Sequence, residues 1–195
     1  MEVDILKHEI VYDGFFRLEK FHLRHSLYAG GWSESMLREI LERGHAVAVL
    51  PYDPVLDAVV MIEQFRIGAL NTENAWLLEI IAGMIEEGEE AREVACREAQ
   101  EEAGCQILAL EHMYEYHVSP GGTSERIILF CGQVDARGLG GIHGLPSEHE
   151  DIKVTVMPAD DALDLLHNGQ IRSATPIIAL QWLAMNRERL RAAWR

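Results

Sequence analysis

The residues best suited to chemistry are glutamates grouped between Gly83 and Cys105, in the stretch GMIEEGEEAREVACREAQEEAGC. Glu98, Glu101 and Glu102 lie close together near its end. On a helix, this spacing brings three carboxylates to one turn. With a backbone carbonyl from the preceding glycine-containing loop, they would form an oxygen-only site of the kind that Mg²⁺ or Mn²⁺ prefers.

The segment that must position these carboxylates is predicted to be a loop followed by a helix. Between Gly88 and Gly104 nearly all residues are good helix formers, and Gly104 is placed to end the helix in a left-handed conformation. One stripe of this helix, with Glu101 at its border, would hold Ala91, Val94, Ala95, Glu98, Glu102 and Cys105. Since an unpaired buried carboxylate is strongly disfavoured, we expect a cation to face the acidic half of the stripe.

The simpler interpretation of this segment is a solvated acidic helix. Arg92, Glu93, Arg97 and Gln100 already provide a solvated face on the other side, which argues against it. We expect Arg97 to be an ion-pair partner that orients one of the glutamates. The Asp-rich loop of an EF-hand is absent, and no Cys/His pair has zinc-site spacing.

The composition limits the partners of the chain. It has 195 residues and a net charge of −15, with an isoelectric point near 4.9. This argues against nucleic acid and anionic membranes as partners, since both favour basic patches. Metal ions would reconcile the acidic site with an anionic substrate. The N-terminus resembles no signal peptide and no apolar run is long enough to span a membrane. Cys96, Cys105 and Cys131 are expected to be reduced core residues, so the prediction is a cytoplasmic protein.

The order of elements predicts two parts. Residues 1–45 alternate in polarity and suggest a small β-rich subdomain, with residues 34–43 open to either helix or strand. Residues 46–195 suggest a mixed sheet between helices. A hairpin is expected over residues 46–65, one further strand over residues 76–83, and strands over 107–118 and 126–135. The last helix is expected to begin with Thr175 as N-cap and Pro176 as its first residue, with Ala184 on its core side.

The acidic segment resembles the Nudix box, G-x5-E-x7-R-E-U-x-E-E-x-G-U, where U is a bulky apolar residue. The resemblance implies an α/β fold, the Nudix fold, with a mixed β-sheet in an α/β/α sandwich. Pro120, fifteen residues after Cys105, resembles the proline that marks the ADP-ribose pyrophosphatases of this family. The segments REILERGHAV, EQFRIGA, SPGGTSER and GIHGLPSEHEDI are similar to the bacterial members. Cys105 and the small Ala99 are mild departures from the pattern.

The resemblance implies hydrolysis of ADP-ribose to AMP and ribose 5-phosphate. It assigns the metal ligands by motif, and the list is the carbonyl of Ala82 with Glu98, Glu101, Glu102 and Glu150. Two or three Mg²⁺ ions, or Mn²⁺ in their place, would hold the diphosphate and lower the pKa of the attacking water. Glu148 matches the proposed general base, in a loop that could close over the substrate.

The resemblance also implies substrate contacts and a dimer. Arg38 and Arg66 match positions that contact substrate, and Phe16 and Glu39 match adenine contacts. We expect a homodimer with exchanged N-terminal strands, because residues 1–45 are too few and too poor in apolar residues to fold alone. Two alternatives stay open: a Nudix hydrolase for a different nucleoside diphosphate sugar, and a non-catalytic module that senses ADP-ribose. The intact carboxylates argue against the second.

Overall fold

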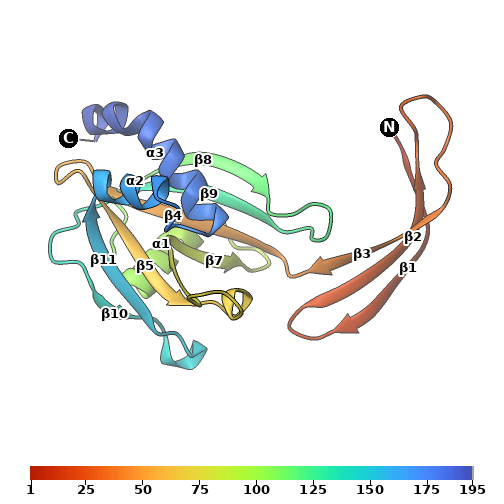
Figure 1. Cartoon of the computed structure of the whole chain (residues 1–195), viewed down its shortest axis with the longest axis horizontal. Helices are drawn as coiled ribbons and strands as arrows, with labels where there is room; N and C mark the ends of the chain where they lie inside the picture. Colours follow the sequence, from red (N-terminus) through yellow and green to blue (C-terminus); the bar gives the residue numbers. More distant parts are fainter. Residues whose placement is uncertain (195) are drawn as a thin grey trace. The chain divides into compact units, whose positions relative to one another are not determined.

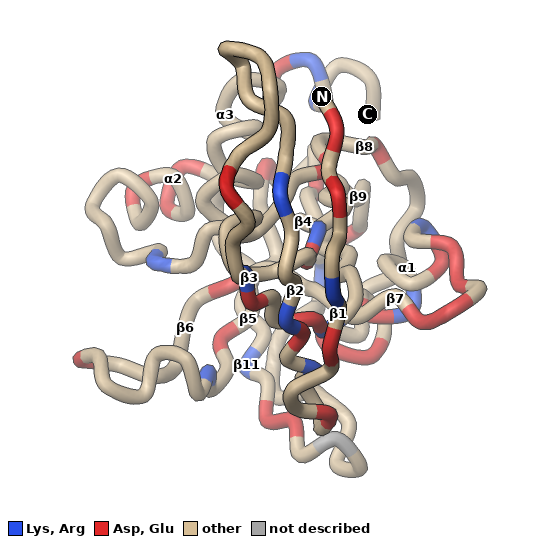
Figure 2. The backbone as a smooth tube through the Cα atoms, turned by 90° about the vertical axis from the view of Figure 1, so that its right-hand side faces the viewer, with Lys and Arg blue, Asp and Glu red and all other residues tan. Residues whose placement is uncertain are grey.

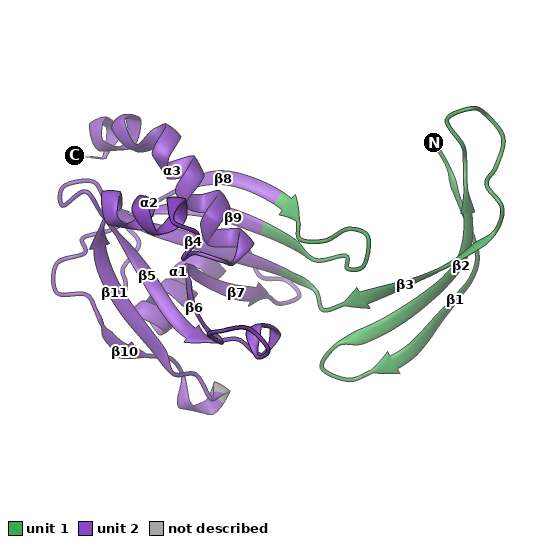
Figure 3. Ribbon diagram, in the orientation of Figure 1, with its two compact units in different colours: residues 1–45, 116–127 green, residues 46–115, 128–195 purple. Residues whose placement is uncertain are grey.

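The computed structural model describes residues 1–194, apart from the side chain of Glu148. The chain divides into two compact units, coloured separately in Figure 3. The first contains residues 1–45 and 116–127, and the second contains residues 46–115 and 128–195. Residues 116–127 had not been assigned to the N-terminal part from the sequence. The dimerisation role of that part stays a prediction.

The first unit is built on a three-stranded antiparallel sheet. Its strands, in the order β1-β2-β3, are Val3–Asp13, Arg17–His25 and Met36–Glu42. The ambiguous segment 34–43 therefore contains a strand rather than a helix, and this strand, β3, is paired along its whole length with β2. Apolar side chains remain largely exposed on this sheet, among them Val3, Ile5, Ile10, Val11, Tyr12 and Leu37.

The second unit contains an eight-stranded sheet in the order β10-β11-β5-β4-β9-β8, with β6 paired to β5 and β7 paired to β4. In chain order, its strands are β4 (His45–Asp53), β5 (Ala58–Phe65), β6 (Trp76–Glu79), β7 (Ile81–Ile85), β8 (Ala109–His117), β9 (Arg126–Gln133), β10 (Gly141–His143) and β11 (Ile152–Pro158). The expected strand over 76–83 is two strands, because the chain changes partner from β5 to β4 at Ile80. Two short 3₁₀ turns, η1 (Ile67–Ala69) and η2 (Pro146–Glu148), lie in the loops.

Helices cover both faces of this sheet. Figure 1 shows α1 (Ala91–Ala103) on one face, with α2 (Ala159–His167) and α3 (Ala174–Ala193) on the other. A strand covered on both sides needs a continuous apolar sequence. The run AVAVL of β4 meets this need and is buried throughout. The predicted α/β/α sandwich is confirmed. Within residues 1–194, no helix is both long and apolar enough to cross a membrane.

An ion-pair network joins α3 to the turn between β4 and β5. Arg187 donates hydrogen bonds from Nε and Nη2 to the two carboxylate oxygens of Asp57, at 2.8 and 2.7 Å. The hydroxyl of the buried Tyr52 donates to the same carboxylate at 2.6 Å. These hydrogen bonds hold the pKa of Asp57 below its usual range, with Arg187 contributing most. The network lies at the end of β4 and β5 away from Arg66.

Three local predictions were wrong. α3 begins at Ala174 after Ser173 rather than after Thr175. Pro176 is thus the third helical residue, where its missing N–H is still one of the groups without a helical partner. Ala184 is exposed. Cys96 is also exposed, on the outer face of α1, while Cys105 and Cys131 are buried; all three are free thiols.

Candidate active site

Helix α1 ends directly after the glutamates of the acidic segment. Gly104 adopts a left-handed conformation, with φ of 60°, and its N–H bonds to Ala99 and Gln100 carbonyls. The N–H of Cys105 donates to the Ala99 carbonyl at 2.9 Å, which completes a Schellman-type end. The helix therefore ends one residue after Glu102, as the sequence predicted.

The buried face of α1 changes from apolar to acidic along its length. Val94, Ala95, Ala99 and Ala103 pack in the core against β4, β5, β7, β9 and β11. Glu102 continues this face and is only 3% exposed. Arg92, Glu93, Arg97 and Gln100 are exposed, as expected. Figure 2 shows that the loop before α1 is itself rich in acidic residues, drawn in red.

Glu102 has one hydrogen-bond donor and several negative neighbours. The backbone N–H of Ala82, on β7, donates to its Oε2 atom at 3.1 Å. Burial, together with the charges of Glu98 and Glu150, raises the pKa of Glu102 to about 8, against the opposing influence of the Ala82 N–H and Arg66. Burial likewise raises the pKa of Glu98 to about 7, against the influence of Arg97. At both carboxylates the effect of burial therefore outweighs that of the nearby positive charge.

Arg97 is the ion-pair partner that the sequence predicted. Its Nη1 atom lies 2.9 Å from Glu98 Oε1 and 2.9 Å from Glu101 Oε2. Its Nη2 atom lies 3.7 Å from Glu89 Oε1. Arg97 therefore links the outer glutamates of the box and leaves Glu102 without a cationic contact of its own.

Gly83 provides the space that Glu98 occupies. A Cβ atom at this position would lie 2.0 Å from Glu98 Oε1 and 2.2 Å from its Cδ atom. The first glycine of the box is therefore required by close approach, since no side chain could share that space with the carboxylate.

Glu150 reaches the same region from the loop before β11. Its Oε2 atom accepts a hydrogen bond from the Leu145 N–H at 3.1 Å, which braces the loop. Its charge acts on both Glu98 and Glu102. We refer to Glu98, Glu101, Glu102 and Glu150 as the carboxylate site.

The chemistry of the donors decides whether this site fits a metal ion. All four side chains offer only oxygen, and the buried Glu102 and the half-buried Glu98 carry repelling charges that a hard divalent cation would neutralise. In the part of the chain that the structure describes, no group of three or more His, Cys, Asp or Glu side chains is already arranged to hold a metal ion. Arg97 instead bridges Glu98 and Glu101, so metal binding would require these carboxylates to turn away from it.

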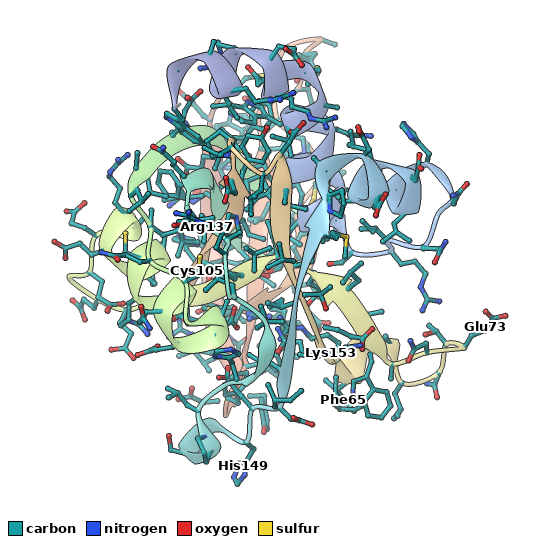
Figure 4. The ribbon with its side chains drawn as sticks, turned by 90° about the vertical axis from the view of Figure 1, so that its left-hand side faces the viewer. Phe65, Glu73, Cys105, Arg137, His149 and Lys153 are labelled. Carbon is teal, nitrogen blue, oxygen red and sulfur yellow. The ribbon has the colours of Figure 1, made fainter. Side chains whose placement is uncertain are left out.

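The predicted general base cannot be placed. Glu148 ends the η2 turn, but its side chain lies outside the described residues. His149 follows it with φ of 58°, and in Figure 4 its side chain points away from the body of the unit. The next residue, Glu150, is half-buried, and its charge acts on Glu98 and Glu102.

Arg66 lies beside the carboxylate site and is held in place by a residue that the sequence did not single out. Its Nε atom donates to Glu79 Oε2 at 2.7 Å, and its charge lowers the pKa of Glu102. Glu79 is only 8% exposed. The signal in the sequence was an acidic residue closing the apolar strand WLLE, but its partner depends on the pairing of β6 with β5.

The other predicted substrate contacts belong to the first unit. Arg38 and Glu39 are exposed on β3, and the Arg38 guanidinium donates to the Leu37 carbonyl at 2.9 Å. Phe16 is half-buried under the guanidinium of Arg43, 5.7 Å from its ring centre. Their roles in binding substrate stay predictions.

Comparisons with known proteins match this arrangement. The NUDIX domain family model matches residues 42–179. The ADP-ribose pyrophosphatase of Escherichia coli (strain K12) is 48% identical over 194 residues, covering 99% of this chain and 93% of that protein. The Haemophilus influenzae protein of the same name is 44% identical, covering 100% of this chain and 91% of its own length.

Two further comparisons bear on substrate and fold. The GDP-mannose pyrophosphatase of Cronobacter sakazakii is 34% identical over 95% of this chain and 96% of its own length. A crystal structure of an ADP compounds hydrolase superposes with a TM-score of 0.74 at 23% identity, covering 99% of this chain and 96% of that one. Its identity is low enough that it supports the fold alone. The family match, the near full-length relatives and the acidic end of α1 together show that this chain belongs to the Nudix family.

Proposed function

We propose that the protein is a Nudix hydrolase that cleaves ADP-ribose to AMP and ribose 5-phosphate, with water attacking the diphosphate. The observation that carries the proposal is the 48% identity, over nearly the whole chain, to proteins named ADP-ribose pyrophosphatase. The box glutamates Glu98, Glu101 and Glu102 are all present on α1. Their presence argues against a module that only senses ADP-ribose.

Nudix hydrolases generally require divalent metal ions. We propose two or three Mg²⁺ ions here, with Mn²⁺ as a substitute, held by the carboxylate site and the carbonyl of Ala82. Bound there, the ions would neutralise the diphosphate and increase the acidity of the attacking water. The raised pKa values of Glu98 and Glu102 support this assignment, because a bound cation would restore their charge.

The side chains around this site divide into two groups with different tasks. The acidic group lies on α1 and in the loop before β11, and with a bound cation that keeps it ionised it accepts but does not donate hydrogen bonds. Arg66 lies near it on the β5 side with its guanidinium anchored at Nε, so both Nη groups stay available for phosphate oxygens. We propose that the diphosphate binds between these groups.

Glu148 is our candidate for the general base. Its place in the chain, two residues before Glu150, would bring it to the same loop as a metal ligand. As a carboxylate it would accept the proton of the attacking water and orient that water toward phosphorus. The test of this assignment is a comparison with Glu150, described in the Discussion.

Other nucleoside diphosphate sugars are the second candidate substrates. The 34% identity to a GDP-mannose pyrophosphatase over almost the full chain favours testing GDP-mannose first. The assay is kcat/KM for purified protein with ADP-ribose, ADP-glucose and GDP-mannose at equal Mg²⁺. The proposal expects ADP-ribose to be preferred by about tenfold or more, which corresponds to about 1.4 kcal/mol of discrimination. A higher kcat/KM for GDP-mannose would contradict it.

We further propose a cytoplasmic homodimer in which the first unit exchanges strands with its partner, so that Arg38, Phe16 and Glu39 reach substrate. The exposed apolar side chains of β1 and β3 support an additional covering surface: Ile5 is 57% exposed, Ile10 53% and Leu37 55%. Light scattering at micromolar concentration should give twice the mass of one chain. A monomer with full activity would contradict the dimer without affecting the proposed reaction.

A further inference from the structure

Gln64 is a buried residue whose amide nitrogen is left unpaired by the part of the chain that the structure describes. Its side chain is on β5 and the residue is only 7% exposed. Its Nε2 atom has no hydrogen-bond partner among the described residues. The other buried side-chain nitrogen in this condition is Nε of Arg191, whose guanidinium is paired with Asp57 at 3.1 Å through Nη1. Since buried donors are almost always satisfied by protein or by ordered water, the Nε2 atom of Gln64 is open to an acceptor from outside the described residues.

The strand places Gln64 on the face of the sheet that carries α1. Val60 and Ile62, on the same strand, pack in the core with α1. Because successive side chains of a strand alternate between faces, Gln64 shares their face. Its partner on β6 is Leu77, and two residues back along β5 Ile62 pairs with Glu79.

The same strand continues from Gln64 to Arg66, which acts on the charge of Glu102. Gln64 therefore lies between the core beneath α1 and the guanidinium beside the carboxylate site. On its other side, β5 pairs Glu63 with Lys153 of β11. The loop that carries Glu150 joins β11 at this end of the strand. At Gln64, strand β5 thus lies between β6, which carries Glu79, and β11, which follows the loop that carries Glu150.

Beside the carboxylate site, the side-chain nitrogens of Arg66 and Gln64 are hydrogen-bond donors. Glu79 holds the guanidinium of Arg66 through Nε at 2.7 Å. The Nε2 atom of Gln64 has no hydrogen-bond partner among the described residues, and the exposed guanidinium of Arg66 keeps its Nη groups open to solvent. Glu98 and Glu102 lie on α1, and they act as acceptors alone once a bound cation keeps them ionised. A ligand that fits here must have anionic oxygens. Some of these oxygens would accept hydrogen bonds from Gln64 and Arg66, and others would bind metal ions held by the glutamates. A diphosphate has such oxygens.

We propose that Gln64 is a substrate-binding residue whose amide donates a hydrogen bond to a phosphate oxygen of the diphosphate, next to Arg66. The proposal rests on the hydrolysis of a nucleoside diphosphate sugar proposed above. It adds a contact that discriminates neither base nor sugar, because every such substrate has the same diphosphate. The unmade hydrogen bond of the free protein is made only when substrate is bound.

The test is Gln64→Met, which keeps the length of the side chain and removes the amide. Loss of a hydrogen bond to a charged acceptor should lower kcat/KM by about 10- to 100-fold. The melting temperature of the free protein should stay level or rise, because a buried unsatisfied donor has been removed. The half-saturating Mg²⁺ concentration should stay within about twofold, since Gln64 faces the phosphate rather than the ion.

The matched control is Gln133→Met. The Nε2 atom of Gln133 donates to the Trp194 carbonyl at 2.7 Å, away from the carboxylate site. This variant should lose melting temperature and keep kcat/KM. Gln64→Glu serves as a second variant, in which a negative charge would face the diphosphate, and its kcat/KM should fall further than that of Gln64→Met.

Three results would overturn the proposal: wild-type kcat/KM in Gln64→Met, wild-type activity in Gln64→Glu, or a fall in melting temperature like that of the Gln133 control. A tenfold rise in the Mg²⁺ requirement would also overturn it, by assigning Gln64 to the metal. The comparison of substrates with the wild-type enzyme tests the proposed substrate, and the Gln64 variants test the contact with the diphosphate. A wild-type enzyme that prefers GDP-mannose would refute ADP-ribose as substrate, while the Gln64 comparison would be made on GDP-mannose with the same expected loss.

Discussion

Replacing Gly83 with alanine should disable the site while leaving the fold intact. The added Cβ atom would lie 2.0 Å from Glu98 Oε1 and 2.4 Å from its Cγ atom. Favourable contacts between such atoms are at about 3.5 Å, so the carboxylate must move by about 1.5 Å. All the atoms in conflict belong to one flexible side chain, and therefore the backbone and the core need not shift.

The size of the effect follows from this displacement. A misplacement of about 1 Å at a catalytic group can reduce the rate by about 100-fold. We therefore expect kcat/KM for ADP-ribose to fall by about 100-fold or more, with a higher Mg²⁺ requirement. Stability should change little, because Gly83 does not have a left-handed φ and Gly→Ala at a compatible position contributes about 0.4–1 kcal/mol.

Two other glycines provide controls. A Cβ atom at Gly132 would lie 2.7 Å from the Cδ1 atom of Ile107 and 3.0 Å from Val49 Cγ2, in the core. Gly132→Ala should therefore lower the melting temperature and keep kcat/KM. At Gly68 nothing lies within 4 Å of the added atom, so Gly68→Ala should change neither. Wild-type kcat/KM in Gly83→Ala would refute the reasoning, and so would a loss of melting temperature equal to that of Gly132→Ala.

Three further predictions concern charges and thiols. Glu102→Gln should weaken Mg²⁺ binding and abolish turnover together, and normal Mg²⁺ binding by calorimetry would contradict its assignment. Because the folded protein raises the pKa of Glu102 to about 8, it holds this proton more tightly than the unfolded chain does. The melting temperature without metal should thus fall between about pH 4 and pH 8, and fall less in Glu102→Gln. Glu148→Gln should lower kcat by about 10²–10⁴ with metal affinity intact, whereas Glu150→Gln should raise the Mg²⁺ requirement. If excess Mg²⁺ restores the activity of Glu148→Gln, Glu148 is a metal ligand and is not the general base. A thiol reagent should modify one cysteine of the native protein, Cys96, and the two buried ones only after unfolding, so two or more reactive thiols in the native state would contradict the burial.

The sequence predicted those parts of the fold that depend on local pattern. Helix α1, its acidic stripe and its end at Gly104 follow from helix propensity, periodicity and the conformational freedom of glycine. The continuous apolar run of β4 likewise predicts a strand buried on both faces. The ion pair of Arg97 with Glu101 was also predictable, since residues four apart on a helix are neighbours.

The parts that the sequence did not reveal depend on pairing between distant segments. Glu79 meets Arg66 because β6 pairs with β5 in one register, with Ile62 opposite Glu79. That register also leaves the amide of Gln64 on the α1 face without a partner. The exposure of Cys96 was missed for a different reason: it lies between the apolar stripe and the solvated face of α1, where small residues fit either environment.

The most direct test of the proposed reaction is hydrolysis of ADP-ribose in ¹⁸O-labelled water with Mg²⁺, followed by mass analysis of both products. The proposed function predicts equal amounts of AMP and ribose 5-phosphate, with one ¹⁸O atom in one of the two and no turnover when EDTA removes the metal. The labelled product identifies the phosphorus that water attacks. Absence of AMP, or undiminished turnover in EDTA, would contradict a metal-dependent hydrolysis at the carboxylate site.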